Sequence, residues 1–350
     1  MKRIRLGRTN LVVSKLGFGS IPIQRVPEEE AVAVVRKCLE LGITFFDTAN
    51  GYTTSEERIG KAISGQRERI IIATKTHAVT PKEVENDLKL SLKRLGVEFI
   101  DLYQFHNIGD TDRLKKILEP DGAMSAVEEA KRAGLIRHIG TSTHSMDTAK
   151  ELVKSGYFET IMFPFNFVAC EAASELIPLA REYDVGFIAM KPLEGGMLDN
   201  VAIAFKYLAQ FPEVVTIVGI EKIEEIEEIV SILENPQPMT IAEQQETERL
   251  RQELGTRFCR RCDYCQPCSQ GIQISSVLGF PSRLKRMPPD RLFSEEFSEP
   301  MEKAANCVEC SDCEERCPYK LPIREMIAEY TDLYRTEKKK YLGMLEAPEK

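Results

Sequence analysis

The chain has 350 residues, enough for one large domain and a smaller one. Its composition, 43% hydrophobic and 29% charged, is typical of a globular enzyme with a large core. A net charge of −8 argues against a nucleic-acid binder and against attachment to an anionic membrane, because both need basic surfaces. No apolar run reaches the roughly 20 residues of a transmembrane helix, and the first residues lack the apolar core of a signal peptide. We therefore expect a cytoplasmic protein with no nucleic-acid or membrane partner.

The first part of the chain predicts a hairpin followed by alternating strands and helices. Residues Arg3–Val13, with a Gly-Arg-Thr-Asn turn in the middle, predict the β-hairpin. Short β-branched runs then predict eight strands: Leu16–Ser20, Thr44–Asp47, Ile70–Lys75, Ile100–Phe105, Ile136–Ser142, Thr160–Phe165, Gly186–Lys191 and Val214–Gly219. Amphipathic segments between them predict helices, among them Glu28–Leu41, Pro81–Leu95, Met124–Ala133, Ala172–Tyr183 and Ile223–Leu233.

This alternation indicates parallel βαβ units. Their number and the length of the segment favour an α/β fold of the (β/α)₈, or TIM-barrel, type, which typically takes ~250 residues. The opening hairpin would then close the floor of the barrel. A doubly wound sheet is the competing architecture, but no glycine-rich phosphate-binding turn opens the first helix.

The barrel is expected to end after a charged helix, Ile241–Leu254. A cysteine-rich segment, Thr256–Leu321, follows and contains a connection rich in proline and arginine, Phe280–Arg291. A closing helix, Ile323–Tyr334, leads to a charged tail, Thr336–Lys350, which we expect to be frayed or loosely docked. We therefore predict two domains, residues 1–254 and residues 255–350.

Polar residues at the carboxyl ends of barrel strands are the candidates for catalysis, because TIM-barrel enzymes place their active sites there. Asp47 and Tyr52 follow the second strand, Lys75 ends the third and His106 follows the fourth. Reduction of a carbonyl group by hydride needs a proton donor for the developing alkoxide. Tyr52 is a suitable donor if Lys75, held by Asp47, lowers its pKa, and His106 would orient the substrate oxygen.

The residues around these four positions resemble the aldo-keto reductase family. The resemblance rests on Phe46-Asp47-Thr48-Ala49-Asn50-Gly51-Tyr52, Ala73-Thr74-Lys75, Asp101-Leu102-Tyr103-Gln104-Phe105-His106 and Gly140-Thr141-Ser142, and it extends over about residues 3–235 in the family's order. It implies that Asp47, Tyr52, Lys75 and His106 form the family's catalytic tetrad, with Tyr52 as general acid. It also implies NADPH or NADH as cofactor and a small carbonyl compound as substrate.

The nicotinamide site implied by the resemblance departs from the family pattern. Ser142 is retained, whereas Thr143 stands at an Asn position, Met162 at a Gln position, and Met190 at the position of the stacking aromatic residue. The candidate cofactor-binding residues are Ser142, Thr143, Met162, Met190, Lys191, Pro192, Leu193, Gly195, Gly219 and Lys222. Glu225 stands where the family has an arginine for the 2′-phosphate of NADP. The choice between NAD and NADP therefore stays open.

The cysteine segment predicts iron–sulfur ligation. Cys307, Cys310, Cys313 and Cys317-Pro318 have the spacing of the bacterial ferredoxin motif. The upstream run, Cys259, Cys262, Cys265 and Cys268, has two residues instead of three before its last cysteine. Tetrahedral zinc is the alternative, because paired CxxC motifs also bind zinc.

This segment resembles an α-helical, ferredoxin-like dicluster domain of the kind found fused to aldo-keto reductase barrels. By that analogy Cys307, Cys310, Cys313 and Cys268 hold one 4Fe–4S cluster, and Cys259, Cys262, Cys265 and Cys317 hold the other. Two clusters are favoured, and a single cluster is the alternative.

Two functions remain open from the sequence. The first is an NAD(P)H-dependent carbonyl reductase whose clusters serve structure, sensing or electron exchange. The second is an iron–sulfur electron-transfer or redox-responsive protein whose barrel no longer uses a nicotinamide. A hydride carries two electrons and a cluster carries one, so a one-electron carrier such as ferredoxin is a candidate partner in either case.

Overall fold

The computed structural model describes residues 1–346, with side chains described as far as Met344. Eight parallel strands close into a barrel in the order β10-β3-β4-β5-β6-β7-β8-β9. The strands are β3 (Leu16–Gly19), β4 (Phe45–Asp47), β5 (Ile71–Thr76), β6 (Ile100–Phe105), β7 (Ile136–Ser142), β8 (Thr160–Pro164), β9 (Gly186–Met190) and β10 (Val215–Gly219). The predicted (β/α)₈ barrel is confirmed, and the eight predicted strands coincide with these to within one residue at either end.

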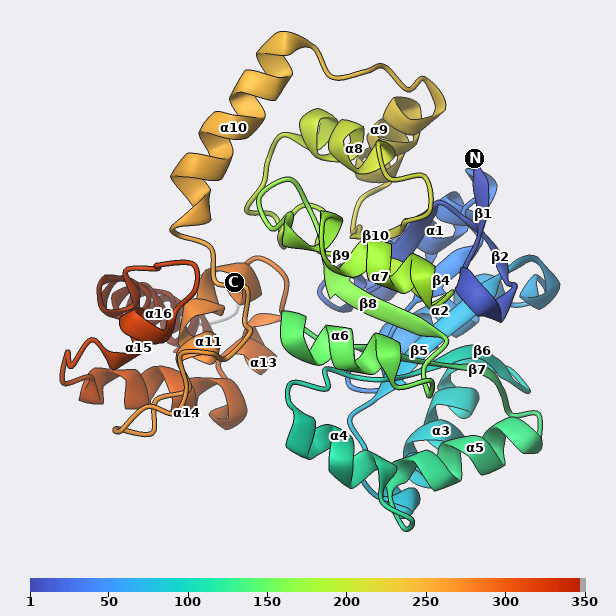
Figure 1. Ribbon diagram of the computed structural model, residues 1–350, viewed down its shortest axis with the longest axis horizontal. Coiled ribbons are helices and arrows are strands. Elements are labelled where there is room, and N and C mark those ends of the chain that lie inside the picture. The colour runs from blue at the N-terminus through green and yellow to red at the C-terminus, as the bar shows by residue number, and fades with distance from the viewer. Residues whose placement is uncertain (347–350) are drawn as a thin grey trace.

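Helices surround the barrel and connect its strands (Figure 1). They are α1 (Glu28–Glu40), α2 (Ser55–Ile63), α3 (Pro81–Leu95), α4 (Thr111–Leu118), α5 (Ala123–Arg132), α6 (Met146–Lys154), α7 (Leu176–Glu182), α8 (Val201–Ala209) and α9 (Ile223–Glu234). Their apolar faces and the outer faces of the strands form one large hydrophobic core. A second, smaller cluster fills the barrel interior, where Phe45, Leu102, Met162 and Ile188 are almost completely buried.

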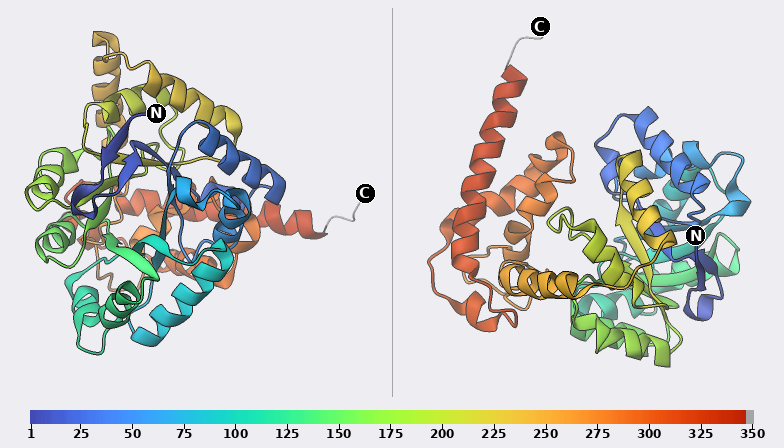
Figure 2. Two further views of the ribbon diagram at one scale, coloured as in Figure 1. Left: turned by 90° about the vertical axis from the view of Figure 1, so that its right-hand side faces the viewer. Right: turned by 90° about the horizontal axis from the view of Figure 1, so that it is seen from above.

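The amino-terminal hairpin lies at the end of the barrel opposite to the cysteine segment (Figure 2, right). It pairs β1 (Arg3–Arg5) with β2 (Val12–Ser14). Leu6, which is 1% exposed, packs against Gly186 at the start of β9, and the N–H of Arg8 donates to the carbonyl of Asp184 at 2.7 Å. The hairpin closes the floor of the barrel, as the sequence predicts.

The chain leaves the barrel along α10 (Ile241–Gly255) and enters a second helical unit (Figure 1). This unit contains α11 (Ile274–Leu278), α12 (Phe280–Leu284), α13 (Pro289–Leu292), α14 (Glu295–Lys303), α15 (Asp312–Arg316) and α16 (Ile323–Glu346). It has a hydrophobic cluster of its own, which includes Val277, Phe280, Met301 and Met326. The predicted connection Phe280–Arg291 is largely helical.

The carboxyl-terminal helix is longer than predicted. The helix expected to end at Tyr334 continues to Glu346, so the expectation of a frayed tail from Thr336 is wrong as far as residue 346. Tyr334 and Lys338 on α16 hold Glu302 of α14, which explains why the charged segment stays helical. Residues 347–350 of that predicted tail lie outside the described residues. Among the helices described, none has the length and apolarity needed to cross a membrane.

Candidate active site and cysteine-rich cap

The structure brings the four predicted catalytic residues together at the carboxyl end of the barrel. The Lys75 ammonium donates to Asp47 Oδ1 at 2.5 Å and to the carbonyl of Thr48 at 2.8 Å. Lys75 Nζ lies 5.3 Å from the centre of the Tyr52 ring. The His106 and Tyr52 rings meet edge to face, with centroids 5.7 Å apart.

A short turn explains how Tyr52 reaches this position. The strand Phe45–Asp47 is fully buried, and the chain then leaves the barrel mouth. The N–H of Asn50 donates to the carbonyl of Lys75 at 3.0 Å, and the N–H of Tyr52 donates to the carbonyl of Ala49 at 2.9 Å. These two bonds fold the loop back, so that the phenol lies beside the ammonium of the neighbouring strand.

The charges in this group are fixed by one buried ion pair. Asp47 and Lys75 have side chains only 3% and 2% exposed, and Gln104 Nε2 donates to the second carboxylate oxygen of Asp47 at 3.1 Å. Burial lowers the pKa of Lys75, but Asp47 and Tyr52 outweigh burial and the pKa is raised from its ordinary value. Lys75 is therefore an ammonium ion at neutral pH.

The pKa of Tyr52 is raised, although the sequence argument expected Lys75 to lower it. Burial of the phenol raises the pKa most, and the opposing effect of Lys75 is the next largest. Lys75 thus acts in the expected direction without determining the outcome. In the resting protein Tyr52 keeps its proton, as a proton donor must.

Three histidines line the same mouth in their neutral form. Burial, followed by the charge of Lys75, lowers the pKa of His106 well below its ordinary value. The ring of His77 stacks on His106 at a centroid distance of 4.2 Å. Burial and then the charge of Lys191 lower the pKa of His144 well below its ordinary value. Neutral imidazoles can donate or accept a hydrogen bond, so His106 is able to orient a substrate oxygen.

The predicted nicotinamide-binding residues of β7, β8 and β9 lie around this mouth. Ser142 ends β7, and its Oγ accepts a hydrogen bond from the N–H of Asn107 at 2.9 Å. The N–H of Thr143 donates to the carbonyl of Met162 at 3.1 Å. The side chain of Met162 is 1% exposed and belongs to the apolar interior of the barrel, and Met190 packs against that cluster.

The loop after β9 holds the next group of predicted residues, Lys191, Pro192, Leu193 and Gly195. Lys191 and Gly195 both have left-handed backbone conformations, with φ of 60° and 68°. Asn166, which follows β8 and is fully buried, donates to the carbonyl of Lys191 at 3.0 Å and to Glu194 Oε2 at 2.9 Å. This amide therefore fixes the loop, and with it the position of the Lys191 ammonium.

Of the last two predicted residues, Gly219 ends β10 and Lys222 directly precedes α9. Gly219 packs against Pro22, and Lys222 is exposed. The carboxylate of Glu225 accepts hydrogen bonds from the N–H groups of Glu221 and Lys222, at 3.0 and 3.2 Å. It thus caps the chain just before the helix and places a negative charge at a helix N-terminus, a natural position for a phosphate group.

The cysteine-rich unit covers the barrel mouth. It contacts segments that follow five of the eight strands. The contacts are hydrogen bonds donated by Arg291 to Gln24 (3.3 Å) and Gly51 (2.9 Å), by Tyr264 to Asp147 (2.6 Å), by Arg260 to Val168 (3.3 Å) and by Lys285 to Gly196 (2.7 Å). Figure 2 (right) shows the two units side by side, with α16 on the outer face. Residues of the second unit therefore contribute to the surroundings of Tyr52.

The eight cysteines of this unit lie in two groups. Cys268, Cys307, Cys310 and Cys313 line a common pocket. Cys259, Cys262, Cys265 and Cys317 form the second group: the thiol of Cys262 lies within electrostatic range of Cys259 and Cys317, and that of Cys265 within range of Cys259 and Cys262. All eight are free thiols. These groups coincide with the two ligand sets expected from the ferredoxin analogy.

The loops between the cysteines are turned by residues with left-handed backbones, Arg261, Asp263, Glu309 and Ser311. Within residues 1–346, no three His, Cys, Asp or Glu side chains gather as a site for a single ion. The sequence spacing of the cysteines is close to that of ferredoxin motifs, in which thiolates hold a four-iron cluster.

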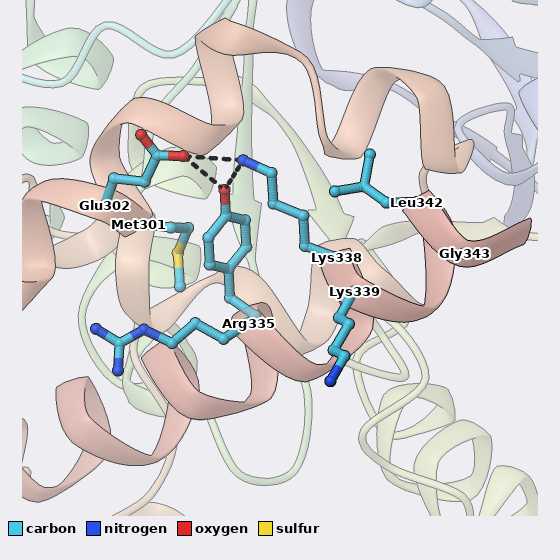
Figure 3. A pocket seen from close by; sticks show the side chains of 8 residues that line it. Met301, Glu302, Arg335, Lys338, Lys339, Leu342 and Gly343 are labelled. Carbon is cyan, nitrogen blue, oxygen red and sulfur yellow. Dashed lines mark hydrogen bonds and ion pairs between the residues drawn. The ribbon is translucent and has the colours of Figure 1, made fainter. Parts of the chain in front are cut away.

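A separate groove between α14 and α16 takes no part in this site. Figure 3 shows Glu302 and Lys338 joined by hydrogen bonds across it. Lys338 Nζ donates to Glu302 Oε1 and to the hydroxyl of Tyr334, both at 2.8 Å, and that hydroxyl also donates to Glu302 at 3.2 Å. The groove contains none of the predicted site residues, and its network joins the two helices.

Sequence reasoning missed several residues of the mouth. Asn166 follows a predicted strand and is a polar residue between two phenylalanines, which was an available signal. Arg286 and Arg291 lie in the connection that was treated only as a linker, and both lie close enough to Tyr52 to affect its pKa. No pattern in this connection singles out the two arginines as neighbours of Tyr52.

Comparison with known proteins agrees with both halves of this architecture. The model of the Aldo/keto reductase family matches residues 15–203, and the model of a 4Fe-4S dicluster domain matches residues 258–322. The aldo-keto reductase AKR11C1 from Bacillus halodurans, in its holo form, superimposes with a TM-score of 0.62 at 28% identity, over 71% of this chain and 96% of its own.

Curated relatives match the barrel portion. The uncharacterized oxidoreductase YqkF of Bacillus subtilis is 30% identical over 212 residues, which are 57% of this chain and 67% of that protein. The NADH-specific methylglyoxal reductase of Escherichia coli is 26% identical over 228 residues, 57% of this chain and 69% of that protein. The chain belongs to the aldo/keto reductase family of oxidoreductases and carries a 4Fe-4S dicluster domain after its barrel.

Proposed function

We propose that this protein reduces the carbonyl group of a small molecule with NADH or NADPH, and that Tyr52 is the proton donor. The observation that carries the proposal is the convergence of Tyr52, His106 and the buried Lys75–Asp47 pair at one barrel mouth. We also propose that residues 1–254 form the reductase domain and residues 255–350 the iron–sulfur domain. Their separate hydrophobic clusters support this division.

The chemistry assigns one task to each residue. When bound, the nicotinamide supplies the hydride that forms the new C–H bond at the carbonyl carbon. The Tyr52 hydroxyl gives its proton to the carbonyl oxygen, so that C=O becomes CH–OH and a phenolate remains on Tyr52. The Lys75 ammonium, 5.3 Å from the phenol ring, stabilises that phenolate, and neutral His106 donates a hydrogen bond to the same oxygen.

The residues that would hold the nucleotide are those of the strand ends. Ser142 and Thr143 offer hydroxyl groups for the carboxamide, and the Lys191 ammonium offers a positive charge for the phosphates. The carboxylate of Glu225 at the N-terminus of α9 would repel a 2′-phosphate, which supports NADH over NADPH. The name of the Escherichia coli relative, an NADH-specific methylglyoxal reductase, supports the same choice.

The two groups of cysteines suit two 4Fe–4S clusters, which exchange single electrons when bound. The group of Cys259 lies next to the mouth, because its thiol lies within electrostatic range of Lys191. The group of Cys310 lies towards solvent, because Cys310 is exposed. This order is suited to a one-electron carrier of the ferredoxin type that meets the outer group.

The test is anaerobic oxidation of NADH and NADPH by the iron-loaded protein with a panel of aldehydes and ketones. Tyr52→Phe removes the transferable proton without removing the ring, so turnover should fall by at least about 100-fold while nucleotide affinity stays the same. Normal turnover by Tyr52→Phe would contradict the assignment of Tyr52.

A second candidate is an iron–sulfur electron-transfer or redox-responsive protein whose barrel binds no nicotinamide. Two observations favour it: Glu225 occupies the N-terminus of α9, and the loop at Gly195 packs against Arg286 of the second domain. On this view neither NADH nor NADPH binds in a titration, although dithionite still reduces the clusters. Nucleotide binding with a dissociation constant in the micromolar range would exclude it.

A further inference from the structure

Four cationic side chains meet between the barrel mouth and the second domain, and we call them the cationic seam: Lys191, Arg261, Arg283 and Arg286. A Cβ atom on Gly279 would lie 3.0 Å from Arg261 Nη2 and 3.1 Å from Arg283 Nη1, so both guanidinium groups rest on this glycine.

The other two members of the seam lie around the loop after β9. A Cβ atom on Gly195 would lie 2.8 Å from Arg286 Nε, which places Arg286 against the loop that begins with Lys191. Lys191 is itself within electrostatic range of Arg261 and Arg286.

The positive charge of the seam is poorly compensated. In the described part of the chain, residues 1–346, none of its three arginines forms an ion pair with a carboxylate. Lys191, 10% exposed, has Glu194 at 3.8 Å, and the second oxygen of that carboxylate is taken by Asn166. Asp263 is near Arg261, but its carboxylate accepts a hydrogen bond from Ser275.

The seam arginines are half-buried. Poorly paired cations that are partly withdrawn from water are costly, and the direction of the pKa shifts agrees with such a cost. Burial and then the charge of Arg261 lower the pKa of Arg283 to about 9 and that of Arg286 to about 10. Guanidinium groups nevertheless keep their protons in proteins. A bound anion would offset this cost.

The cysteine thiolates account for only part of this charge. Cys259 lies near Lys191 and Arg261. The charges that act on Arg286 are instead those of Arg261, Glu194 and Tyr52, and Arg286 in turn acts on Lys191. Arg286 therefore lies within electrostatic range of the proposed proton donor.

The backbone of the seam loop is held in a strained form. Lys191 and Glu194 are not glycines, yet both have left-handed φ values, 60° and 45°. Such conformations are strained and concentrate at functional sites. Asn166 holds the loop in this form, in which Lys191 lies within electrostatic range of Arg261 and Arg286.

We propose that Arg286, with Arg261 and Arg283 beside it, binds a carboxylate or phosphate group of the carbonyl substrate, so that this enzyme reduces anionic aldehydes or ketones. Lys191 of the same seam serves the nucleotide phosphates, and the substrate class rests on the proposed carbonyl reduction. Arg286 lies within electrostatic range of Tyr52, which gives a proton to the carbonyl oxygen, so the anionic group of a small molecule whose carbonyl is at Tyr52 would lie toward Arg286. Guanidinium groups pair with carboxylate and phosphate through two parallel hydrogen bonds.

The binding test uses benzoate and inorganic phosphate as probes, titrated calorimetrically into the iron-loaded full-length protein. Arg286→Gln should weaken binding of both probes by about tenfold or more, since hydrogen bonds to charged groups are strong, and Arg286→Lys should restore part of it. Arg335→Gln on the outer face of α16 is the matched control, because Arg335 is 62% exposed and remote from the seam. Probe binding unaffected by Arg286→Gln in a folded variant would overturn the proposal.

The kinetic test compares 4-carboxybenzaldehyde with uncharged benzaldehyde. Arg286→Gln should raise KM for the charged aldehyde by about tenfold and change KM for benzaldehyde by less than about twofold. Equal changes for both aldehydes would overturn the assignment.

Two further results distinguish this proposal from a nucleotide site and from an anion site in a protein that reduces no carbonyl. If NADH affinity, and not benzoate affinity, depends on Arg286, the seam holds the nucleotide diphosphate and the substrate assignment is wrong. If no aldehyde is turned over but benzoate binding still depends on Arg286, the proposed carbonyl reduction fails and the anion site stands.

Discussion

Replacement of Asp47 by Asn tests the buried ion pair on which the proposed acid chemistry depends. At 2.5 Å between Lys75 Nζ and Asp47 Oδ1, the attraction of two unit charges is about 7 kcal/mol at an effective dielectric constant of about 20. Desolvation of both groups offsets much of this, and removal of one partner from a buried pair typically costs about 3–5 kcal/mol. Asn keeps the shape and can still accept from Gln104, so we expect a loss of stability near the lower end, about 3 kcal/mol.

The pH dependence of that loss identifies its cause. In the wild-type protein the pKa of Lys75 is raised above 10.5, so its contribution to stability is constant at lower pH. In Asp47→Asn, burial alone would lower the pKa of Lys75. At pH values between that lowered pKa and 10.5, Lys75 is protonated in the unfolded chain and largely unprotonated in the folded one. The stability of the variant therefore rises with pH across this range.

The assay is urea unfolding followed by circular dichroism at about pH 7 and about pH 9.5, with the wild type measured in parallel. The difference between the two proteins should be smaller at the higher pH. Asp184→Asn is the control, because Asp184 pairs with Arg5 at the surface, where both side chains are about half exposed; its effect should be much smaller. A loss for Asp47→Asn that is the same at both pH values would refute the reasoning.

Two other predictions concern the second domain. Cys310→Ser should remove the outer cluster and lower iron and acid-labile sulfide by about half if two clusters are present, whereas the buried Cys38→Ser should leave iron unchanged; full iron content in Cys310→Ser would show that the ligand set is wrong. Gly195→Ala should lower the thermal midpoint more than Gly196→Ala, because both residues are left-handed but only a Cβ on Gly195 would come within 2.4 Å of Ser282 Oγ. Equal shifts in differential scanning calorimetry would mean that the contact between this loop and the second domain contributes little to stability.

Much of the barrel could be predicted because its signals are local. A run of β-branched residues fixes a buried strand, and the change of period between strand and helix indicates a parallel unit. The candidate catalytic residues followed from the same pattern, since the position of Lys75 at the end of a strand already places it at the mouth. The two groups of cysteines followed from spacing and from the ferredoxin analogy, and the structure groups them in the same way.

The rest could not be predicted because it depends on contacts between distant segments. The raised pKa of Tyr52 results from burial in the folded protein, which no local pattern records. The connection with Arg283 and Arg286 has the composition of a linker, and only its contact with the loop after β9 makes it part of the mouth. The helical end of α16 likewise depends on Glu302, more than 30 residues away in the chain.

The position of the second domain bears on how a two-electron site and one-electron centres can work in the same protein. In a TIM barrel the loops at the mouth determine which substrate reaches the catalytic residues. Here the cover of that mouth is the cysteine-rich unit itself, and Cys259 lies within electrostatic range of Lys191 and Arg261. A change in the charge of a cluster held by the group of Cys259 would therefore act on side chains that would hold the anionic groups of nucleotide and substrate. Because this coupling needs no electron transfer to the substrate, such a cluster would be able to alter binding at the mouth even if the hydride always comes from a nucleotide.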